Sequence, residues 1–276
     1  MRVGIFGAGQ AGLMLCSWLP ANIEVVCFFD NYATKHGMSL ENISVLPFEN
    51  AQELDAIIIA VLNREAAAEI QEQIKAAGFS GEVLNIYDIQ KFQDLRLSTL
   101  RLLAKQIRER KISGEVAELG VYRGNFAAEI NRIFPDKKIY LFDTFTGFDE
   151  KDLQDAEPKM NFSNTSVNLV KKSLPYPSQA VFVVGHFPES LSSCQILPEI
   201  FSLVSLDADL YAPTLSGLEY FYPRLTVGGV ILIHDYNGLQ FPGIRKAVDE
   251  FCEKMRLFVI PLMDLHGTAI LLKQGA

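Results

Sequence analysis

The sequence predicts an α/β protein made of two Rossmann-like domains, each with a mostly parallel sheet covered by helices. Three observations support this: apolar strand-like runs alternate with helical patterns, the alternation occurs twice, and each series opens with a glycine-containing turn after its first strand. The 276 residues correspond to about two domains at roughly 150 residues each. We expect a small Rossmann-like domain of nucleotide-binding type over residues 1–92 and a larger second domain over residues 93–276.

The first series contains apolar runs separated by amphipathic segments. Gly78 ends its second helix, as glycine often does. The predicted elements are strands at 2–6, 23–29, 55–61 and 82–86, a helix that continues to about residue 19, and a helix at 65–77.

The second series follows an amphipathic connector helix at 95–110, in which Leu95, Leu100, Leu103 and Ile107 recur at helical spacing. It ends in an antiparallel hairpin, which closes an otherwise parallel, doubly wound sheet. The predicted elements are strands at 115–120, 138–143, 180–185, 201–207 and 229–235, a helix at 126–134, and the hairpin of 257–262 with 268–273.

Residues 149–178 form the least regular part of the chain. Within them, residues 165–174 are expected to form a helix capped by Asn164 or Ser163. A connection of this length is typical either of a lid or of a solvated surface excursion, and both interpretations stay open.

Composition excludes several classes of protein. Lys and Arg number 25 and Asp and Glu number 33, and the resulting net charge of −8 disfavours nucleic acid as a partner. Apolar runs stay shorter than the roughly 18 residues of a membrane span, and the four cysteines lack C-x-x-C spacing. We therefore expect a cytoplasmic protein without a zinc cluster or a disulfide framework.

The first glycine turn has the spacing of a dinucleotide-binding turn. Gly7, Gly9 and Gly12 follow the first strand directly, and Asp30 ends the next strand, where a carboxylate can accept from ribose hydroxyls. NAD(P) or another nucleotide is one interpretation, and an empty strand-to-helix turn is the other. The segment also resembles the Rossmann-like module attached to transferases of sugar and polysaccharide biosynthesis, through residues 3–9, 25–31 and 57–60.

The second glycine turn is accompanied by acidic residues at strand ends. Glu118 lies near the end of one strand, Gly120 and Gly124 follow it, and Asp143 ends the next strand. Ligands of open α/β sheets bind outside the carboxyl ends of the strands, so these residues should line one crevice. Because no phosphate-binding G-x-x-x-x-G-K-[ST] sequence is present, an adenosine ligand without phosphates fits better than ATP.

Two further strands end in aspartate. Asp207 and Asp235 should project above the same edge of the sheet, where hard oxygen ligands favour Mg²⁺ or another divalent cation. The alternative is that terminal aspartates cap the helices that follow. His234 is a ligand, a base or a packed histidine, and Asp209 is expected to cap a helix or to lie behind the site.

The region from about Gly114 to Phe251 resembles the macrocin O-methyltransferase family of class I methyltransferases, which methylate sugar hydroxyls of glycosylated natural products with S-adenosylmethionine and Mg²⁺. The matching segments are 118–124, 143–147, 165–167, 185–191, 207–211, 222–225, 228–229 and 234–236. The family usually has a second aspartate where this chain has His234, which leaves the third ligand and the metal open. The resemblance implies metal binding by Asp207, His234 and Asp235, and cofactor contacts by Glu118, Gly120, Tyr122, Gly124, Asp143, Phe145, Gly185 and Phe187.

These observations predict an S-adenosylmethionine-dependent, divalent-metal-dependent O-methyltransferase that acts on a hydroxyl of a sugar or a glycosylated small molecule. Asp207 or His234 would take the hydroxyl proton. The alternatives are an NAD(P)-dependent sugar-modifying enzyme that uses the first domain, and a non-catalytic module that binds a sugar nucleotide. A homo-oligomer is compatible with each.

Overall fold

The computed structural model describes residues 1–276 except 20–21, 51–53, 91–93, 149–161, 195 and 276. The chain divides into two compact units. One contains Met1–Leu95 and Met263–His266, and the other contains Arg96–Leu262 and Gly267–Ala276. The boundary expected near Phe92 stays a prediction, because residues 91–93 lie outside the described residues. No helix in the described ranges has the length and apolar composition that a membrane span requires.

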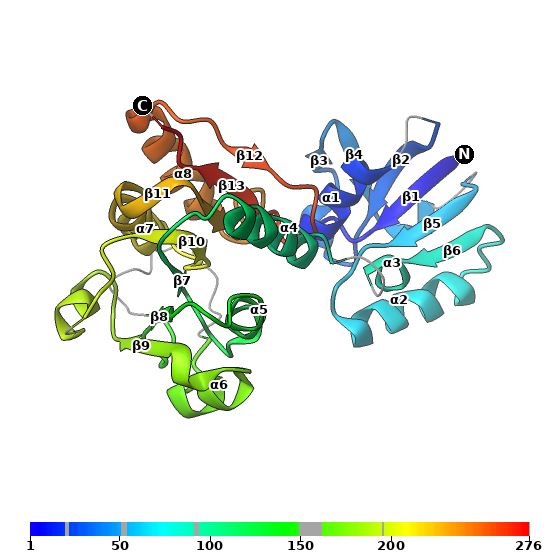
Figure 1. Ribbon diagram of the computed structural model, residues 1–276. Coiled ribbons are helices and arrows are strands. Elements are labelled where there is room, and N and C mark those ends of the chain that lie inside the picture. Colours follow the sequence, from blue (N-terminus) through cyan, green and yellow to red (C-terminus); the bar gives the residue numbers. More distant parts are fainter. Residues whose placement is uncertain (20–21, 51–53, 91–93, 149–161, 195, 276) are drawn as a thin grey trace. The chain divides into compact units, whose positions relative to one another are not determined.

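The first unit contains a six-stranded sheet in the order β3-β4-β2-β1-β5-β6, in which β3 pairs antiparallel with β4 and the other pairs are parallel (Figure 1). Helix α1 packs on one face through Leu15, and helix α2 packs on the other through Ile70 and Ile74. The strands are β1 (Arg2–Phe6), β2 (Glu24–Phe29), β3 (Ser39–Leu40), β4 (Ile43–Leu46), β5 (Ala56–Ile59) and β6 (Glu82–Asn85); the helices are α1 (Gln10–Trp18), α2 (Arg64–Ala76) and α3 (Ile86–Gln90).

The second unit contains a seven-stranded sheet in the order β12-β13-β11-β10-β7-β8-β9, in which β13 is antiparallel to both of its neighbours. The direction of strand addition reverses between β7 and β10, which makes the carboxyl ends of these two strands the switch point of the sheet. The strands are β7 (Glu115–Leu119), β8 (Ile139–Asp143), β9 (Ala180–Val184), β10 (Phe201–Leu206), β11 (Leu225–Ile233), β12 (Ile260–Pro261) and β13 (Ala269–Leu272).

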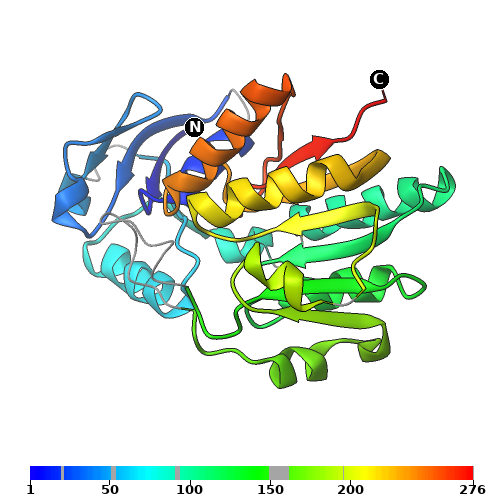
Figure 2. The same cartoon turned by 90° about the vertical axis from the view of Figure 1, so that its left-hand side faces the viewer.

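Helices cover both faces of this second sheet. Helices α7 (Tyr211–Arg224) and α8 (Pro242–Met255) lie side by side and pack against alternate strand residues on one face (Figures 1 and 2). Helices α4 (Leu95–Glu109), α5 (Asn125–Ile133) and α6 (Val167–Ser173) contribute to the hydrophobic core on the other face. Both faces are therefore dry, which explains the continuous apolar runs of the central strands.

Most predicted elements are found within a few residues of their predicted ends, but several features differ. The short strands β3 and β4 and the helix α3 are not among the predicted elements. Helix α6 is capped by Ser166, whose hydroxyl accepts from the backbone N–H of Leu169, rather than by Asn164 or Ser163. The connector α4 buries Arg96 and leaves Leu95 partly exposed, contrary to the predicted apolar face. Most of the irregular stretch, residues 149–161, lies outside the described residues.

Gly120 brings two chain segments into direct contact at the switch point. It adopts a φ of +83°, and a Cβ atom at this position would lie 1.9 Å from the carbonyl oxygen of Asp207. The backbone N–H of Asp207 in turn donates to the carbonyl of Leu119 at 2.8 Å. Only glycine permits this approach, so the β7 turn is closed directly against the segment that follows β10.

Gly120→Ala should therefore destabilise the fold strongly. Gly37 is a matched control, because its φ of +81° is similar, while a Cβ atom added there would meet no heavy atom within 4 Å. Both alanines carry the left-handed backbone cost of about 1–2 kcal/mol, but only G120A adds an overpacking cost of about 1–3 kcal/mol. Differential scanning calorimetry should show a clearly larger fall in Tm for G120A, and equal falls would contradict this account.

Candidate active site

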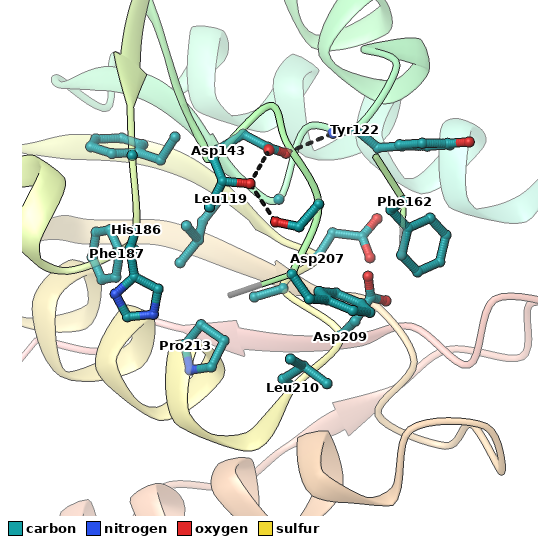
Figure 3. A pocket seen from close by; sticks show the side chains of 17 residues that line it. Leu119, Tyr122, Asp143, Phe162, His186, Phe187, Asp207, Asp209, Leu210 and Pro213 are labelled. Atoms are coloured by element: carbon teal, nitrogen blue, oxygen red, sulfur yellow. Dashed lines mark hydrogen bonds between the residues drawn. The ribbon is translucent and has the colours of Figure 1, made fainter. Parts of the chain in front are cut away.

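A pocket opens at the carboxyl ends of β7, β8, β9 and β10 (Figure 3). Figure 3 shows Tyr122 and Phe162 at one end, with the carboxylates of Asp207 and Asp209 directed toward that side, and His186 and Phe187 at the other end. The described residues that line it are Leu119, Gly120, Tyr122, Phe142, Asp143, Thr144, Gly147, Phe148, Phe162, Gly185, His186, Phe187, Asp207, Ala208, Asp209, Leu210 and Pro213.

Asp143 organises the glycine turn that borders the pocket. Its Oδ2 accepts from the backbone N–H groups of Val121 at 2.7 Å and Tyr122 at 2.8 Å. Its Oδ1 accepts from the backbone N–H of Phe145 at 2.6 Å. Backbone amides thus hold the carboxylate at the end of β8, where it faces the pocket.

Glu118 lies inside the sheet and outside the set of residues that line the pocket. It is 1% exposed, and its Oε1 accepts from the hydroxyl of Ser205 at 3.1 Å. Burial raises the pKa of Glu118 to about 8, and the negative charge of Asp207 contributes in the same direction. The cofactor contact expected of Glu118 stays a prediction.

Asp207, His234 and Asp235 converge above the ends of β10 and β11. His234 Nδ1 lies 3.0 Å from Asp207 Oδ1 and 2.9 Å from Asp235 Oδ2. Strand β11 ends at Ile233, so strict alternation of side chains no longer applies at His234, and its ring turns toward the carboxylates. Burial lowers the pKa of His234, but the Asp207 charge and hydrogen bonds to both carboxylates outweigh it and raise the pKa to about 10.

The three side chains fit a divalent cation. Each offers one ligand atom, and these atoms lie within 4.8 Å of one another. Two carboxylates and one imidazole form a mixed oxygen and nitrogen ligand set, which several divalent metals accept. Neither aspartate caps the helix that follows it. The N-cap residue is Leu210 in α7 and Phe241 in α8, and neither cap makes a side-chain hydrogen bond. The capping interpretation of Asp207 and Asp235 is therefore wrong.

Asp209 lies in the pocket, whereas the sequence predicted a helix cap or a residue behind the site. It lines the pocket and adopts a φ of +59°. Burial, together with the charges of Asp207 and Asp235, raises the pKa of Asp209 well above the ordinary range. It does not cap α7, so the expected capping role is wrong. The D-x-D spacing of Asp207 and Asp209 after a buried strand was the available signal.

The other predicted cofactor residues divide into two groups. Gly120, Tyr122, Asp143, Gly185 and Phe187 line the pocket. Residues outside the lining set are Glu118, Gly124 and Phe145. For Gly124, a Cβ atom would lie 2.7 Å from the side chain of Val170, so this glycine serves the packing of α6 beside the turn.

In the first unit, the predicted nucleotide residues lie together at the turn between β1 and α1. Asp30 Oδ2 accepts from the backbone N–H of Ala8 at 3.0 Å and pairs with Lys35 Nζ at 2.8 Å. A Cβ at Gly12 would lie 2.1 Å from the carbonyl of Gly7, so these two glycines pack the helix on the turn, whereas Gly9 faces open space. Nucleotide binding at this turn stays a prediction.

The strand order and the pocket together define the class of the protein. A seven-stranded sheet with a reversed strand next to one edge, and with a pocket over the carboxyl ends of its central strands, is the architecture of class I methyltransferases. The solved structure of the O-methyltransferase NovP shares this fold, with a TM-score of 0.54 and 23% identity, and the match covers 65% of this chain and 80% of that chain. S-adenosylmethionine is the cofactor of this class.

The chain belongs to the macrocin O-methyltransferase family, whose sequence model matches residues 48–274, more than half of the chain. It is accordingly an O-methyltransferase. The match to the family model begins at residue 48, well before Gly114, where the resemblance described from the sequence motifs begins. Residues 1–83 also match a second family model, described as "C2185-like, N-terminal".

Two similar proteins are O-methyltransferases of glycosylated compounds by name. Mycinamicin III 3''-O-methyltransferase of Micromonospora griseorubida is 28% identical over 178 residues, which cover 58% of this chain and 68% of that protein. The 8-demethyl-8-(2,3-dimethoxy-alpha-L-rhamnosyl)-tetracenomycin-C 4'-O-methyltransferase of Streptomyces olivaceus is 25% identical over 199 residues, which cover 66% of this chain and 74% of that protein.

Glu118→Gln should flatten the pH dependence of stability. The pKa of about 8 lies above the ordinary glutamate value of 4.5, so the folded state retains the proton, and this stabilisation is lost as the pH rises from 4.5 through 8. Between pH 5.5 and 7.5, the wild-type free energy of unfolding should fall by about 2 kcal/mol more than that of E118Q. Urea denaturation measures this difference, with E253Q at an exposed position as control; equal slopes would refute it.

Proposed function

We propose that this enzyme transfers a methyl group from S-adenosylmethionine to a hydroxyl of a sugar, either free or carried by a small molecule, with the help of a divalent cation. One observation carries the proposal: Asp207 and Asp209 line the same pocket as Gly120 and Asp143, so acidic groups and the glycine turn face one cavity. The names of the two relatives, a 3''- and a 4'-O-methyltransferase of glycosylated compounds, support a sugar as acceptor.

The cofactor would lie along the glycine turn of β7. Asp143 faces the pocket from the end of the adjacent strand, where its carboxylate can accept from ribose hydroxyls while it retains its backbone hydrogen bonds. Gly185 and Phe187 continue the pocket beyond β9 and offer an apolar wall for an adenine ring. When bound, S-adenosylmethionine supplies an electrophilic methyl group.

The acceptor would lie at the end of the pocket where Tyr122 and Phe162 face Asp207 and Asp209 (Figure 3). Methylation of a hydroxyl requires that its proton leave. Asp209 is placed to accept this proton, because it lines the pocket without taking part in the hydrogen bonds between Asp207 and His234. His234 is not assigned as the base, because in this proposal its imidazole is a ligand of the cation.

Asp207, His234 and Asp235 would hold the cation, which would supply Lewis-acid chemistry for the acceptor hydroxyl. The first unit, with β4-β2-β1-β5-β6 parallel and helices on both faces, supports a second Rossmann-like domain. The contacts of Asp30 with Ala8 and Lys35 account for its buried carboxylate without a nucleotide, so we propose no ligand for this unit.

The proposal is tested first by ligand binding and turnover. Isothermal titration calorimetry should detect S-adenosylhomocysteine binding and no binding of NADH or NADPH. Methyl-labelled S-adenosylmethionine should then label at least one member of a panel of dTDP-L-rhamnose, dTDP-D-glucose and methyl α-L-rhamnoside. Binding of NADPH without S-adenosylhomocysteine would contradict the proposal and favour the first unit as the catalytic one.

Asp207→Asn should lower turnover at least 100-fold, because the amide replaces a carboxylate that would hold the cation at the acceptor end of the pocket. Its affinity for S-adenosylhomocysteine should stay within twofold of wild type. D136N is the matched control, since Asp136 is exposed and precedes β8 at the opposite end of the strand. Wild-type turnover in D207N would remove this residue from the mechanism.

His234→Asp should change the metal preference. Imidazole favours transition metals over Mg²⁺, so wild-type enzyme treated with EDTA should regain more activity with Mn²⁺ or Co²⁺ than with Mg²⁺ at equal concentration. The H234D variant, with three carboxylates, should shift the preference toward Mg²⁺ by several-fold. Full turnover in excess EDTA would show that the cluster works without a cation.

A further inference from the structure

A buried arginine at the start of the connector helix contacts the cluster of Asp207, His234 and Asp235. The side chain of Arg96 is 8% exposed, and its Nη2 lies 3.5 Å from Asp207 Oδ2. The same nitrogen lies 3.5 Å from the hydroxyl of Ser205, which in turn donates to Glu118. A guanidinium is costly to bury without a charged partner, and Asp207 is the ion-pair partner of Arg96.

Packing fixes the direction of this guanidinium. Its central carbon lies 3.7 Å from the centre of the Phe126 ring of α5, a distance at which the cation and the ring face attract each other. Arg96 occupies a core position of α4 together with Leu100, Ala104 and Ile107. The helix and the ring together leave the guanidinium little freedom. It therefore presents a fixed donor to Asp207, which directly follows β10.

Arg96 and His234 share the two oxygens of Asp207. Arg96 faces Oδ2, whereas His234 Nδ1 lies 3.0 Å from Oδ1. Rotation of the carboxylate would break both contacts at once. The plane of the carboxylate is therefore defined from two sides, by one side chain from α4 and one from the end of β11.

We propose that Arg96 is a positioning residue for methyl transfer: it holds the Asp207 carboxylate in the orientation in which Oδ1 faces His234 and the acceptor end of the pocket. This inference rests on the proposed function, and it assigns to the connector helix a part of the active site. Arg96 is not among the described residues that line the pocket. Its effect on the reaction passes through Asp207.

The test compares three variants of the full chain. R96M removes the charge but keeps the length of the side chain, R96K keeps the charge without the planar fork, and R101M removes an exposed arginine of the same helix as the matched control. Turnover is measured with the panel acceptor that gives the highest rate and is divided by the number of S-adenosylhomocysteine-binding sites found by calorimetry. Crystal structures with S-adenosylhomocysteine give the position of Asp207.

We expect kcat per binding site to fall about tenfold in R96M, with the dissociation constant of S-adenosylhomocysteine within twofold of wild type. R96K should recover part of the loss, and R101M should match wild type. The crystal structure of R96M should show the Asp207 carboxylate turned away from His234. A purely structural role would lower the Tm and the number of binding sites without changing kcat per site.

Two results would overturn the proposal: an R96M enzyme with the kcat per site of R101M, or an Asp207 carboxylate that keeps its place beside His234 in R96M. If R96M binds no S-adenosylhomocysteine, R96Q, which retains a donor, takes its place with the same expectations. Loss of binding in both variants would assign Arg96 to folding and would likewise overturn it. Wild-type protein that fails to bind S-adenosylhomocysteine defeats the proposed function instead, whereas the position of Asp207 in the variants still decides the role of Arg96.

Discussion

The contact between Gly120 and the backbone of Asp207 is the constraint on which the active-site pocket depends. Two parallel strands that run in the centre of the sheet end here, and the chain leaves them in opposite directions. A crevice forms between the diverging segments, but its floor is closed by backbone atoms in contact. The cofactor turn and the acidic cluster therefore share a common rigid base, and neither can shift without moving the other.

Charge around Asp207 is balanced by pairing over short distances rather than by exposure to water. Arg96, Asp207, His234 and Asp235 form a chain of alternating charge from α4 to the end of β11 when His234 holds its proton. Glu118 is linked to these four residues through Ser205. Its raised pKa keeps the Glu118 carboxyl protonated near neutral pH, so it adds no further negative charge. Such a buried network costs stability if one member is lost, but it holds the remaining members in defined directions.

The sequence predicted the parts of the fold that depend on long periodic patterns. The central strands and the helices α2, α4 and α5 follow from runs of apolar residues, and the second glycine turn and the terminal aspartates locate the site at one edge of its sheet. The two-residue strand β3 is too short to leave a periodic pattern. The orientation of His234 depends on the residue at which β11 ends, which alternation alone does not specify.

Arg96 shows a different kind of omission. In an amphipathic helix an arginine beside leucines is expected to face water, and only the tertiary structure reveals the Phe126 ring and the carboxylate that receive it. The position of Asp209 in the pocket was likewise not predicted, because an aspartate in the turn before a helix is typical of an ordinary helix cap. In both cases the functional interpretation required neighbours that are distant in the sequence.

The turn between β12 and β13 has a consequence for how the protein can be divided. Residues 263–266 belong to the first compact unit, where Leu265 is 5% exposed within its core and the indole of Trp18 donates to the carbonyl of Met263 at 2.7 Å. The polypeptide thus enters that unit twice, once at its beginning and once close to its end. A shortened chain that starts at residue 96 would expose the side chain of Leu265 to water, so the second unit cannot be cut from the first at a single point in the sequence without cost.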